Sequence, residues 1–201
     1  MLERILHHHL PDEIIVSYVH LKRKEERSNK DINESITGTR LITKLAQMYL
    51  DAPLTEVISK KYEKPKAFIN GLEISVSFSH TKSGLSAGIS REYVVGCDIE
   101  LTDRKVSPSL LARMRCPFEG EELYRKTDPI QIWTLKESAL KMIGTGLRKP
   151  MNSVTVTLLE PSLFDVEFSD GKRAKICSFR HKHHWISICY HKHILPGEGR
   201  L

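Results

Sequence analysis

Four short runs near the C-terminal end of the chain constrain its fold more than any other feature. In each run apolar and polar residues alternate over a strand-length stretch, and turn residues separate the runs. Alternation places the apolar side chains on one face of a strand, and Asp-Gly between two such runs, here Asp170-Gly171, is a strong hairpin signal. The pattern predicts an antiparallel sheet with strands at residues 154–159, 163–168, 173–179 and 184–190.

The rest of the chain mixes strand and helix patterns. Apolar residues at helical spacing predict a first helix that Pro53 ends, and two more helices follow the central strands. The last helix ends at Gly144-Thr145-Gly146, as helices often do. The basic stretch 22–27 fits a helix start or a solvated loop, and residues 196–199 fit a loose tail. The predicted elements are strands at 13–21, 74–79, 85–90 and 93–101 and helices at 31–50, 107–126 and 130–143.

No sharp repeat and no break in composition divides the chain. Its 201 residues suffice for one sizeable domain or for two small halves that share a core. The order of strands and helices favours an α+β fold of two halves packed together and divided near residue 95. We therefore expect an N-terminal half over residues 1–94 and a C-terminal half over residues 95–201.

Composition narrows the functional classes. With 40% hydrophobic and 28% charged residues the chain is typical of globular proteins, and no apolar run approaches the roughly 20 residues of a membrane span. The N-terminus lacks the basic-then-apolar layout of a secretory signal, so a cytoplasmic protein with no membrane partner is expected. The four cysteines lack zinc-like spacing, and the two in strand-like runs are expected to be buried free thiols. The net charge of +6 indicates an acidic partner, but no nucleic-acid-binding module is recognisable.

Two segments carry the chemistry. In the last central strand, Asp98 and Glu100 share one face, because side chains two residues apart in a strand point the same way. In the last helix, Glu137 and Lys141 lie one turn apart and also point together. Taken alone, the first pair would more often be a solvated strand edge and the second a surface ion pair. If the two pairs converge, they form a site for a hard divalent cation and a phosphate ester.

These segments resemble the paired signature of 4′-phosphopantetheinyl transferases. The family patterns are Gly-(Ile/Val)-Asp-(Ile/Val/Leu)-Glu and then (Phe/Trp)-(Ser/Cys/Thr)-x-Lys-Glu-(Ser/Ala)-x-x-Lys. The chain has Gly96-Cys97-Asp98-Ile99-Glu100 and then Trp133-Thr134-Leu135-Lys136-Glu137-Ser138 with Lys141. Segments similar to motifs of the larger, single-chain type are Tyr62-Glu63-Lys64-Pro65, Phe78-Ser79-His80-Thr81 and Gly144-Thr145-Gly146-Leu147.

The resemblance implies two similar α/β halves packed as a pseudo-dimer in one chain, each a small antiparallel sheet with a long helix. Coenzyme A would bind at their junction, and a monomer is expected. The implied activity is that of a holo-acyl-carrier-protein synthase: 4′-phosphopantetheine moves from coenzyme A to a serine hydroxyl of an apo acyl or peptidyl carrier protein, releasing adenosine 3′,5′-bisphosphate. The carrier's pathway stays open. The alternative is a homologue that binds coenzyme A or a carrier protein without catalysis.

The same resemblance assigns roles in the site. Asp98, Glu100 and Glu137 would hold Mg²⁺, for which Mn²⁺ can substitute, and Lys141 would neutralise or protonate the leaving phosphate. Mg²⁺ takes such oxygen ligands and keeps positions for phosphate oxygens. Glu137 is the first candidate for the base that takes the serine proton. Glu119 is the second, because its segment resembles a family stretch that carries a glutamate.

Cations of the N-terminal half would meet the phosphates of coenzyme A. The predicted cofactor contacts are Lys64, Ser79, His80, Lys141, Arg40 and Lys44. The first four match motif positions, whereas the register of the last two is open. Departures from the family pattern are Glu63, Thr81 and Cys97, and none removes a predicted metal ligand. The His-rich segments 7–9 and 181–184 could bind a transition metal, but they are expected to be exposed polar turns or a terminal tail.

Overall fold

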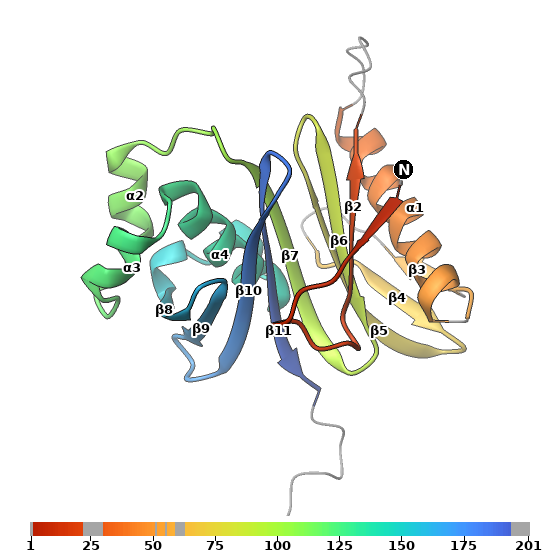
Figure 1. The fold of residues 1–201 in the computed structure, drawn as a ribbon. Helices are drawn as coiled ribbons and strands as arrows, with labels where there is room; N and C mark the ends of the chain where they lie inside the picture. Colours follow the sequence, from red (N-terminus) through yellow and green to blue (C-terminus); the bar gives the residue numbers. More distant parts are fainter. Residues whose placement is uncertain (1, 22–29, 51, 55, 59–62, 194–201) are drawn as a thin grey trace, which may run out of the picture.

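The protein consists of two antiparallel sheets packed against each other, as the computed structural model shows (Figure 1). The structure describes residues 2–21, 30–50, 52–54, 56–58 and 63–193. The six-stranded sheet has the order β1-β2-β6-β5-β4-β3, and the five-stranded sheet has the order β7-β11-β10-β9-β8. The strands are β1 (Leu2–Ile5), β2 (Ile15–His20), β3 (Glu56–Ile58), β4 (Lys66–Ile69), β5 (Leu72–His80), β6 (Gly84–Ser90), β7 (Tyr93–Leu101), β8 (Val154–Glu160), β9 (Leu163–Phe168), β10 (Arg173–His181) and β11 (His184–Lys192).

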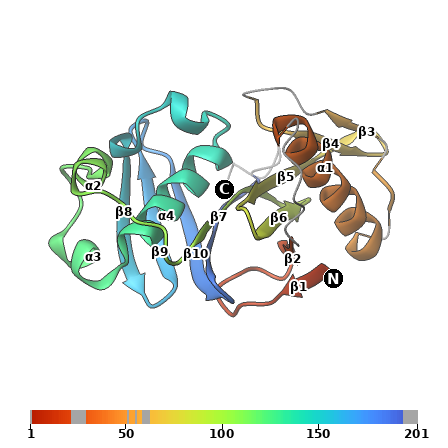
Figure 2. The same ribbon diagram turned by 90° about the horizontal axis from the view of Figure 1, so that it is seen from above.

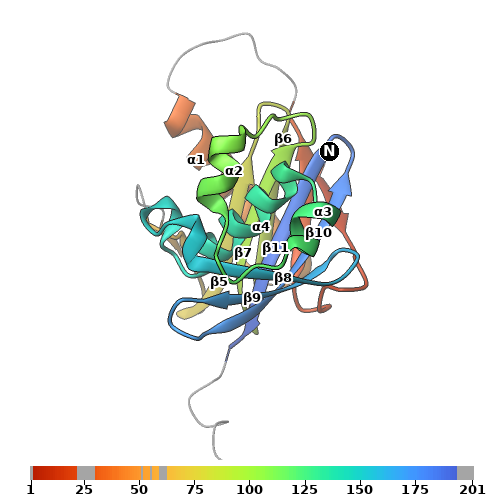
Figure 3. The same cartoon turned by 90° about the vertical axis from the view of Figure 1, so that its left-hand side faces the viewer.

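One long helix covers each sheet. The helices are α1 (Lys30–Tyr49), α2 (Pro108–Met114), α3 (Glu121–Lys126) and α4 (Pro129–Met142), with 3₁₀ turns η1 (Gly146–Arg148) and η2 (Met151–Ser153). α1 packs on β5 and β6, and α4 packs on β7 and β11. α2 and α3 lie with α4 on one side of the five-stranded sheet (Figure 2 and Figure 3).

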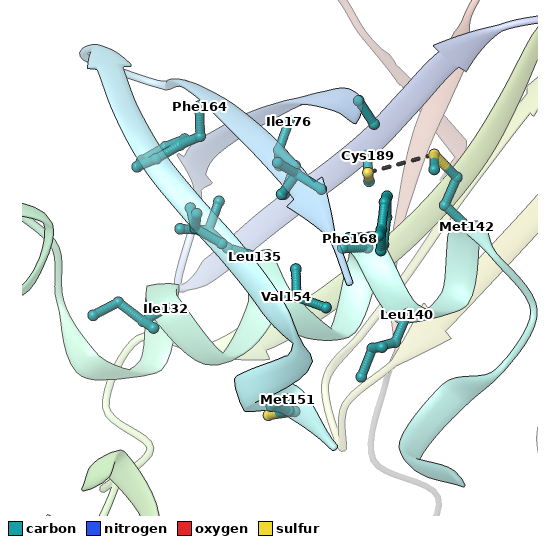
Figure 4. Packing of buried hydrophobic residues seen from close by; sticks show 14 of the residues in the cluster. Ile132, Leu135, Leu140, Met142, Met151, Val154, Phe164, Phe168, Ile176 and Cys189 are labelled. Atoms are coloured by element: carbon teal, nitrogen blue, oxygen red, sulfur yellow. Dashed lines mark hydrogen bonds between the residues drawn. The ribbon is translucent and has the colours of Figure 1, made fainter. Parts of the chain in front are cut away.

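Three clusters of buried side chains hold these layers together. The first lies between α4 and the five-stranded sheet and includes Leu135, Phe164 and Ile176 (Figure 4). The second joins the sheets to each other and includes Tyr18 of β2 and Ile188 of β11. The third lies under α1. Because burying one such side chain contributes roughly 1.5–3 kcal/mol, the second cluster is a strong reason for the two sheets to stay in contact.

The structure confirms the α+β fold class and most of the predicted elements. The single helix predicted over 107–126 is wrong, because α2 and α3 are separate helices. Arg115 after α2 and Gly120 before α3 both have extended backbone, and Pro117 between them lacks the N–H that a continuing helix needs. Strands β1, β3 and β4 were not predicted, because runs of three or four residues are too short to show alternation.

Some predictions concern boundaries and termini. The predictions for residues 22–27 and 196–199 lie outside the described residues. The six-stranded sheet ends with Ser90, and the five-stranded sheet begins with Tyr93. The division into functional halves at residue 95 stays a prediction. Among the described helices, none combines the length and apolar character needed to cross a membrane.

The histidine-rich segments do form turns with exposed residues, His8, Lys182 and His183, but the expectation is wrong for His7 and His184, which are packed. His7 stacks on Phe179 with ring centroids 5.0 Å apart. His184 is 2% exposed, and its Nε2 lies 2.9 Å from Thr81 Oγ1 of the six-stranded sheet's β5–β6 turn. Both segments lie where the sheets meet, which explains the packing of these two residues. All four cysteines are buried and free, including the two predicted to be so.

Candidate active site

A single glycine on β7 lets α4 lie directly on the strand. A Cβ atom at Gly96 would stand 2.1 Å from the backbone O of Ser138 and 2.4 Å from the backbone N of Met142. No other residue allows this approach, because Cβ cannot come so close to backbone atoms. The close contact brings the last two turns of α4, with Glu137 and Lys141, over the strand that carries Asp98. The two segments singled out by their sequence therefore converge.

Asp98 is held by one side chain from strand β5 and one from helix α4. It is 3% exposed, and its Oδ1 accepts from Lys141 Nζ at 2.7 Å and from Ser79 Oγ of β5 at 2.8 Å. Lys141 Nζ also donates to Ser79 Oγ at 2.9 Å. Burial acts to lower the pKa of Lys141, but the nearby carboxylates of Asp98 and Glu137 outweigh it and the pKa is raised. Lys141 is thus a firmly protonated cation beside a buried carboxylate.

Two more carboxylates lie near this pair. Burial raises the pKa of Glu137, with repulsion by Asp98 adding to the effect, although Lys141 acts in the opposite direction. Burial and the charge of Asp98 raise the pKa of Glu100 to about 7, against the effect of Arg104, which forms an ion pair with it. The carboxylates feel one another's charge, so a cation placed among them would be attracted by all three.

The residues fit a divalent cation. Oδ2 of Asp98 and Oε2 of Glu137 are buried and have no hydrogen-bond partner. Buried polar atoms are normally paired, so two such oxygens in one region indicate a missing partner with positive charge. In the described parts of the chain, no three His, Cys, Asp or Glu side chains already form a set that could hold a metal ion. Glu100 is turned to Arg104 and would have to leave it to join Asp98 and Glu137.

A cleft of about 250 Å³ lies beside these groups. Its lining includes Lys64 and Phe78 from the six-stranded side and Glu137 and Lys141 from α4. Lys64 Nζ donates to the backbone O of Met142, at the end of α4, at 3.0 Å. Burial lowers the pKa of Lys64 to about 8. The cleft therefore has cations on both walls, as a phosphate-bearing ligand would require.

The other predicted cofactor contacts are more scattered. His80 follows Ser79 as the last residue of β5 and is half-buried. Arg40 and Lys44 lie on α1, where their side chains are exposed. The structure therefore brings Ser79, Lys64 and Lys141 together, whereas Arg40 and Lys44 lie on an outer surface of the helix.

Glu119 lies in the core and not among the cleft residues. Its carboxylate accepts from the backbone N–H of Cys116 at 2.8 Å and of Val156 at 2.9 Å, and from the hydroxyl of Tyr124. It also forms a fully buried ion pair with Lys136 at 2.6 Å. With four donors its oxygens are occupied, which is the state of a structural carboxylate and not of a base awaiting a proton.

Sequence reasoning missed Lys136, the lysine of the Lys-Glu pair in the second motif. Its Nζ donates to the backbone O of Val154 at 2.9 Å and of Met151 at 3.3 Å, in addition to Glu119. It therefore ties α4 to the start of β8 and to the α2–α3 loop. The available signal was a lysine within an otherwise apolar face of the helix, since a buried lysine needs a charged partner.

Comparisons with known proteins identify the family of this chain. Residues 94–194 match the model of the 4′-phosphopantetheinyl transferase superfamily. The chain is similar to the 4′-phosphopantetheinyl transferase gsp of Aneurinibacillus migulanus, with 27% identity over 178 residues that cover 74% of this chain and 70% of the relative. It is similar to a 4′-phosphopantetheinyl transferase of Bacillus subtilis, with 28% identity over 154 residues that cover 71% of this chain and 66% of the relative. The chain belongs to the 4′-phosphopantetheinyl transferase superfamily.

Proposed function

We propose that the protein transfers the 4′-phosphopantetheine group of coenzyme A to a serine hydroxyl of an apo acyl or peptidyl carrier protein and releases adenosine 3′,5′-bisphosphate. Superfamily membership supports the transfer to carrier proteins. The observation that carries the proposal is the buried Asp98–Lys141 pair beside two unpartnered carboxylate oxygens at a cleft with cations on both walls.

Asp98, Glu100 and Glu137 are the residues that would hold Mg²⁺ or Mn²⁺. When bound, the ion supplies Lewis-acid polarisation of the phosphoryl group and offsets charge on the leaving phosphate. Lys141 Nζ lies 2.7 Å from Asp98 Oδ1, and the side chain lines the cleft. Its ammonium can therefore neutralise or protonate the departing phosphate oxygen. The raised pKa of Lys141 favours the charged form that binds phosphate.

Glu137 is the preferred general base. Its carboxylate lines the cleft, one of its oxygens is unpartnered, and burial raises its pKa, which makes it a better proton acceptor near neutral pH. It would take the proton of the carrier serine as the serine oxygen bonds to phosphorus and the phosphoryl–oxygen bond to the leaving nucleotide breaks. Glu119 is a poor alternative, because four donors occupy its carboxylate inside the core.

Coenzyme A would occupy the cleft with its phosphates near cations. Lys64 and Lys141 line the cleft and are the first proposed contacts of the phosphates. His80, which directly follows Ser79 in the sequence, is a further proposed contact. Arg40 or Lys44 would contribute only if the cofactor extends to the exposed side of α1. A monomer is proposed, since both walls of the cleft come from one chain. The net charge of +6 suits an acidic carrier protein.

The test uses purified full-length protein, coenzyme A, Mg²⁺ and a panel of apo carriers from fatty acid, polyketide and nonribosomal peptide synthesis. Mass spectrometry should show one added phosphopantetheine on at least one carrier, and chelation of the metal should abolish the transfer. No transfer to any carrier by folded, metal-loaded protein would refute the proposal. Coenzyme A binding that persists without turnover would instead support the non-catalytic alternative.

A further inference from the structure

A row of serines on β5 joins the two sheets. Ser75, Ser77 and Ser79 alternate along the strand, so their side chains share one face. β7 is the edge strand of the five-stranded sheet. The backbone N–H groups of Val95 and Cys97 on that edge donate to Ser75 Oγ and Ser77 Oγ, each at 2.9 Å. Serine side chains thus take the place that a further strand would fill, and they fix how β7 lies against β5.

The third serine of the row bonds a side chain and not the backbone. Ser79 Oγ donates to Asp98 Oδ1 at 2.8 Å and accepts from Lys141 Nζ at 2.9 Å. Lys141 also donates to the same Oδ1. Every donor to Asp98 among the described residues therefore uses one oxygen, while Oδ2 is buried without a partner. The carboxylate is held by one oxygen and offers the other.

We infer that Ser79 is a positioning residue, which orients Asp98 so that Oδ2 is free for the divalent cation. This inference rests on the proposed function. Lys141 cannot keep the orientation alone, because a divalent cation on Asp98 repels its ammonium and the leaving phosphate attracts it. Ser79 is neutral, so its hydrogen bond to Oδ1 survives the arrival of the cation.

The test measures Mn²⁺ binding to the full chain by electron paramagnetic resonance, without coenzyme A and without turnover. Ser79→Ala should weaken Mn²⁺ binding about tenfold, the effect of losing one hydrogen bond to a charged group. Ser79→Thr, which keeps the hydroxyl, should restore Mn²⁺ binding.

Ser86→Ala is the matched control. Ser86 is the cross-strand neighbour of Ser79 and is also buried, and its hydroxyl donates to the backbone O of Ser17 at 3.0 Å, with no bond to Asp98. It should lose some thermal stability and keep parental Mn²⁺ affinity. If Ser79→Ala fails to fold by circular dichroism, Ser79→Cys serves instead, because a thiol has a similar shape and is a weak donor.

Three results would overturn the inference. Ser79→Ala could leave Mn²⁺ binding unchanged, which would show that Ser79 does not set the orientation of Asp98. Ser86→Ala could weaken Mn²⁺ binding as much as Ser79→Ala, which would make the effect a general loss of stability. The parent protein could bind no Mn²⁺, or bind it in a way that Asp98→Ala leaves intact. Either result would also remove the proposed metal site. If Asp98→Ala abolishes Mn²⁺ binding and Ser79→Ala leaves it unchanged, the inference fails while the proposed function stands.

Discussion

Replacing Gly96 with alanine should damage both activity and stability. The added Cβ would stand 2.1 Å from Ser138 O, 2.4 Å from Met142 N and 2.8 Å from Met142 Cα. These are backbone atoms of α4 and its C-terminal end, so no side-chain rotation relieves the contacts. To restore ordinary van der Waals separation, α4 must move from β7 by roughly 1 Å.

The sizes of the stability loss and of the activity loss both follow from that displacement of α4. Overpacking of a well-filled interior costs about 1–3 kcal/mol, and we expect the upper part of that range because the clash is with backbone. Glu137 and Lys141 flank Ser138 on the same helix and would move with it, away from Asp98. Since a misplacement of about 1 Å among reacting groups can cost on the order of 100-fold in rate, we expect a loss of that size.

Gly88→Ala is the control for this change. Gly88 also lies in a buried central strand, but a Cβ there would meet Val95 Cγ2 at 3.9 Å and Ile188 Cδ1 at 4.0 Å, which are ordinary contacts. The assays are urea unfolding and the rate of phosphopantetheine transfer to the carrier that the panel identifies. Near-parental transfer by Gly96→Ala, or an equal loss by Gly88→Ala, would refute the argument that Gly96 sets the position of α4.

Other substitutions test the cleft carboxylates, the buried ion pair of the core and the pH dependence of stability. Asp98→Asn and Glu137→Gln should each reduce transfer at least about 100-fold with circular dichroism unchanged, and near-normal transfer by either would contradict its assigned role. Lys136→Met should cost about 3–5 kcal/mol in urea unfolding because it leaves Glu119 as an unpaired buried charge, whereas the double variant with Glu119→Leu should lose less than the sum of the single losses; simple additivity would exclude coupling. Burial lowers the pKa of His184 to about 4, so the unfolded chain binds a proton at higher pH than the folded chain. The contribution of His184 to the free energy of unfolding should therefore be fully present above about pH 6.5 and be lost, by up to about 3 kcal/mol, toward pH 4. His184→Gln should flatten that part of the pH profile of stability. An unchanged profile would show that other groups cause the decline.

Local patterns predicted the parts of the site that depend on one element. Alternation along β7 places Asp98 and Glu100 on one face, and a single turn of α4 separates Glu137 from Lys141. Both relations follow from the backbone geometry of a strand and a helix. The same local logic recovered α1 and the four C-terminal strands, because these elements are long enough to show a period.

Contacts between distant segments could not be predicted in this way. No local rule says that Ser77 caps the N–H of Cys97, because that bond depends on how two sheets pack. Lys136 looks like any helical lysine until the fold shows it to be fully buried against Glu119. The split between α2 and α3 was missed although a local signal for it exists, since Pro117 and Gly120 both disfavour a continuous helix.

The two parts of the fold contribute different kinds of residues to the site. The region that matches the superfamily model, residues 94–194, carries Asp98, Glu137 and Lys141. Ser79, which holds Asp98, comes from β5 outside that region. Without β5, the edge of β7 would be open to water, and the charge of Asp98 would be screened by solvent. Burial strengthens both the pull on a cation and the cost of an unpaired carboxylate. Under the proposed function the six-stranded sheet would therefore do more than bind coenzyme A, because Ser79 holds the buried carboxylate of Asp98 in the orientation that a cation site needs.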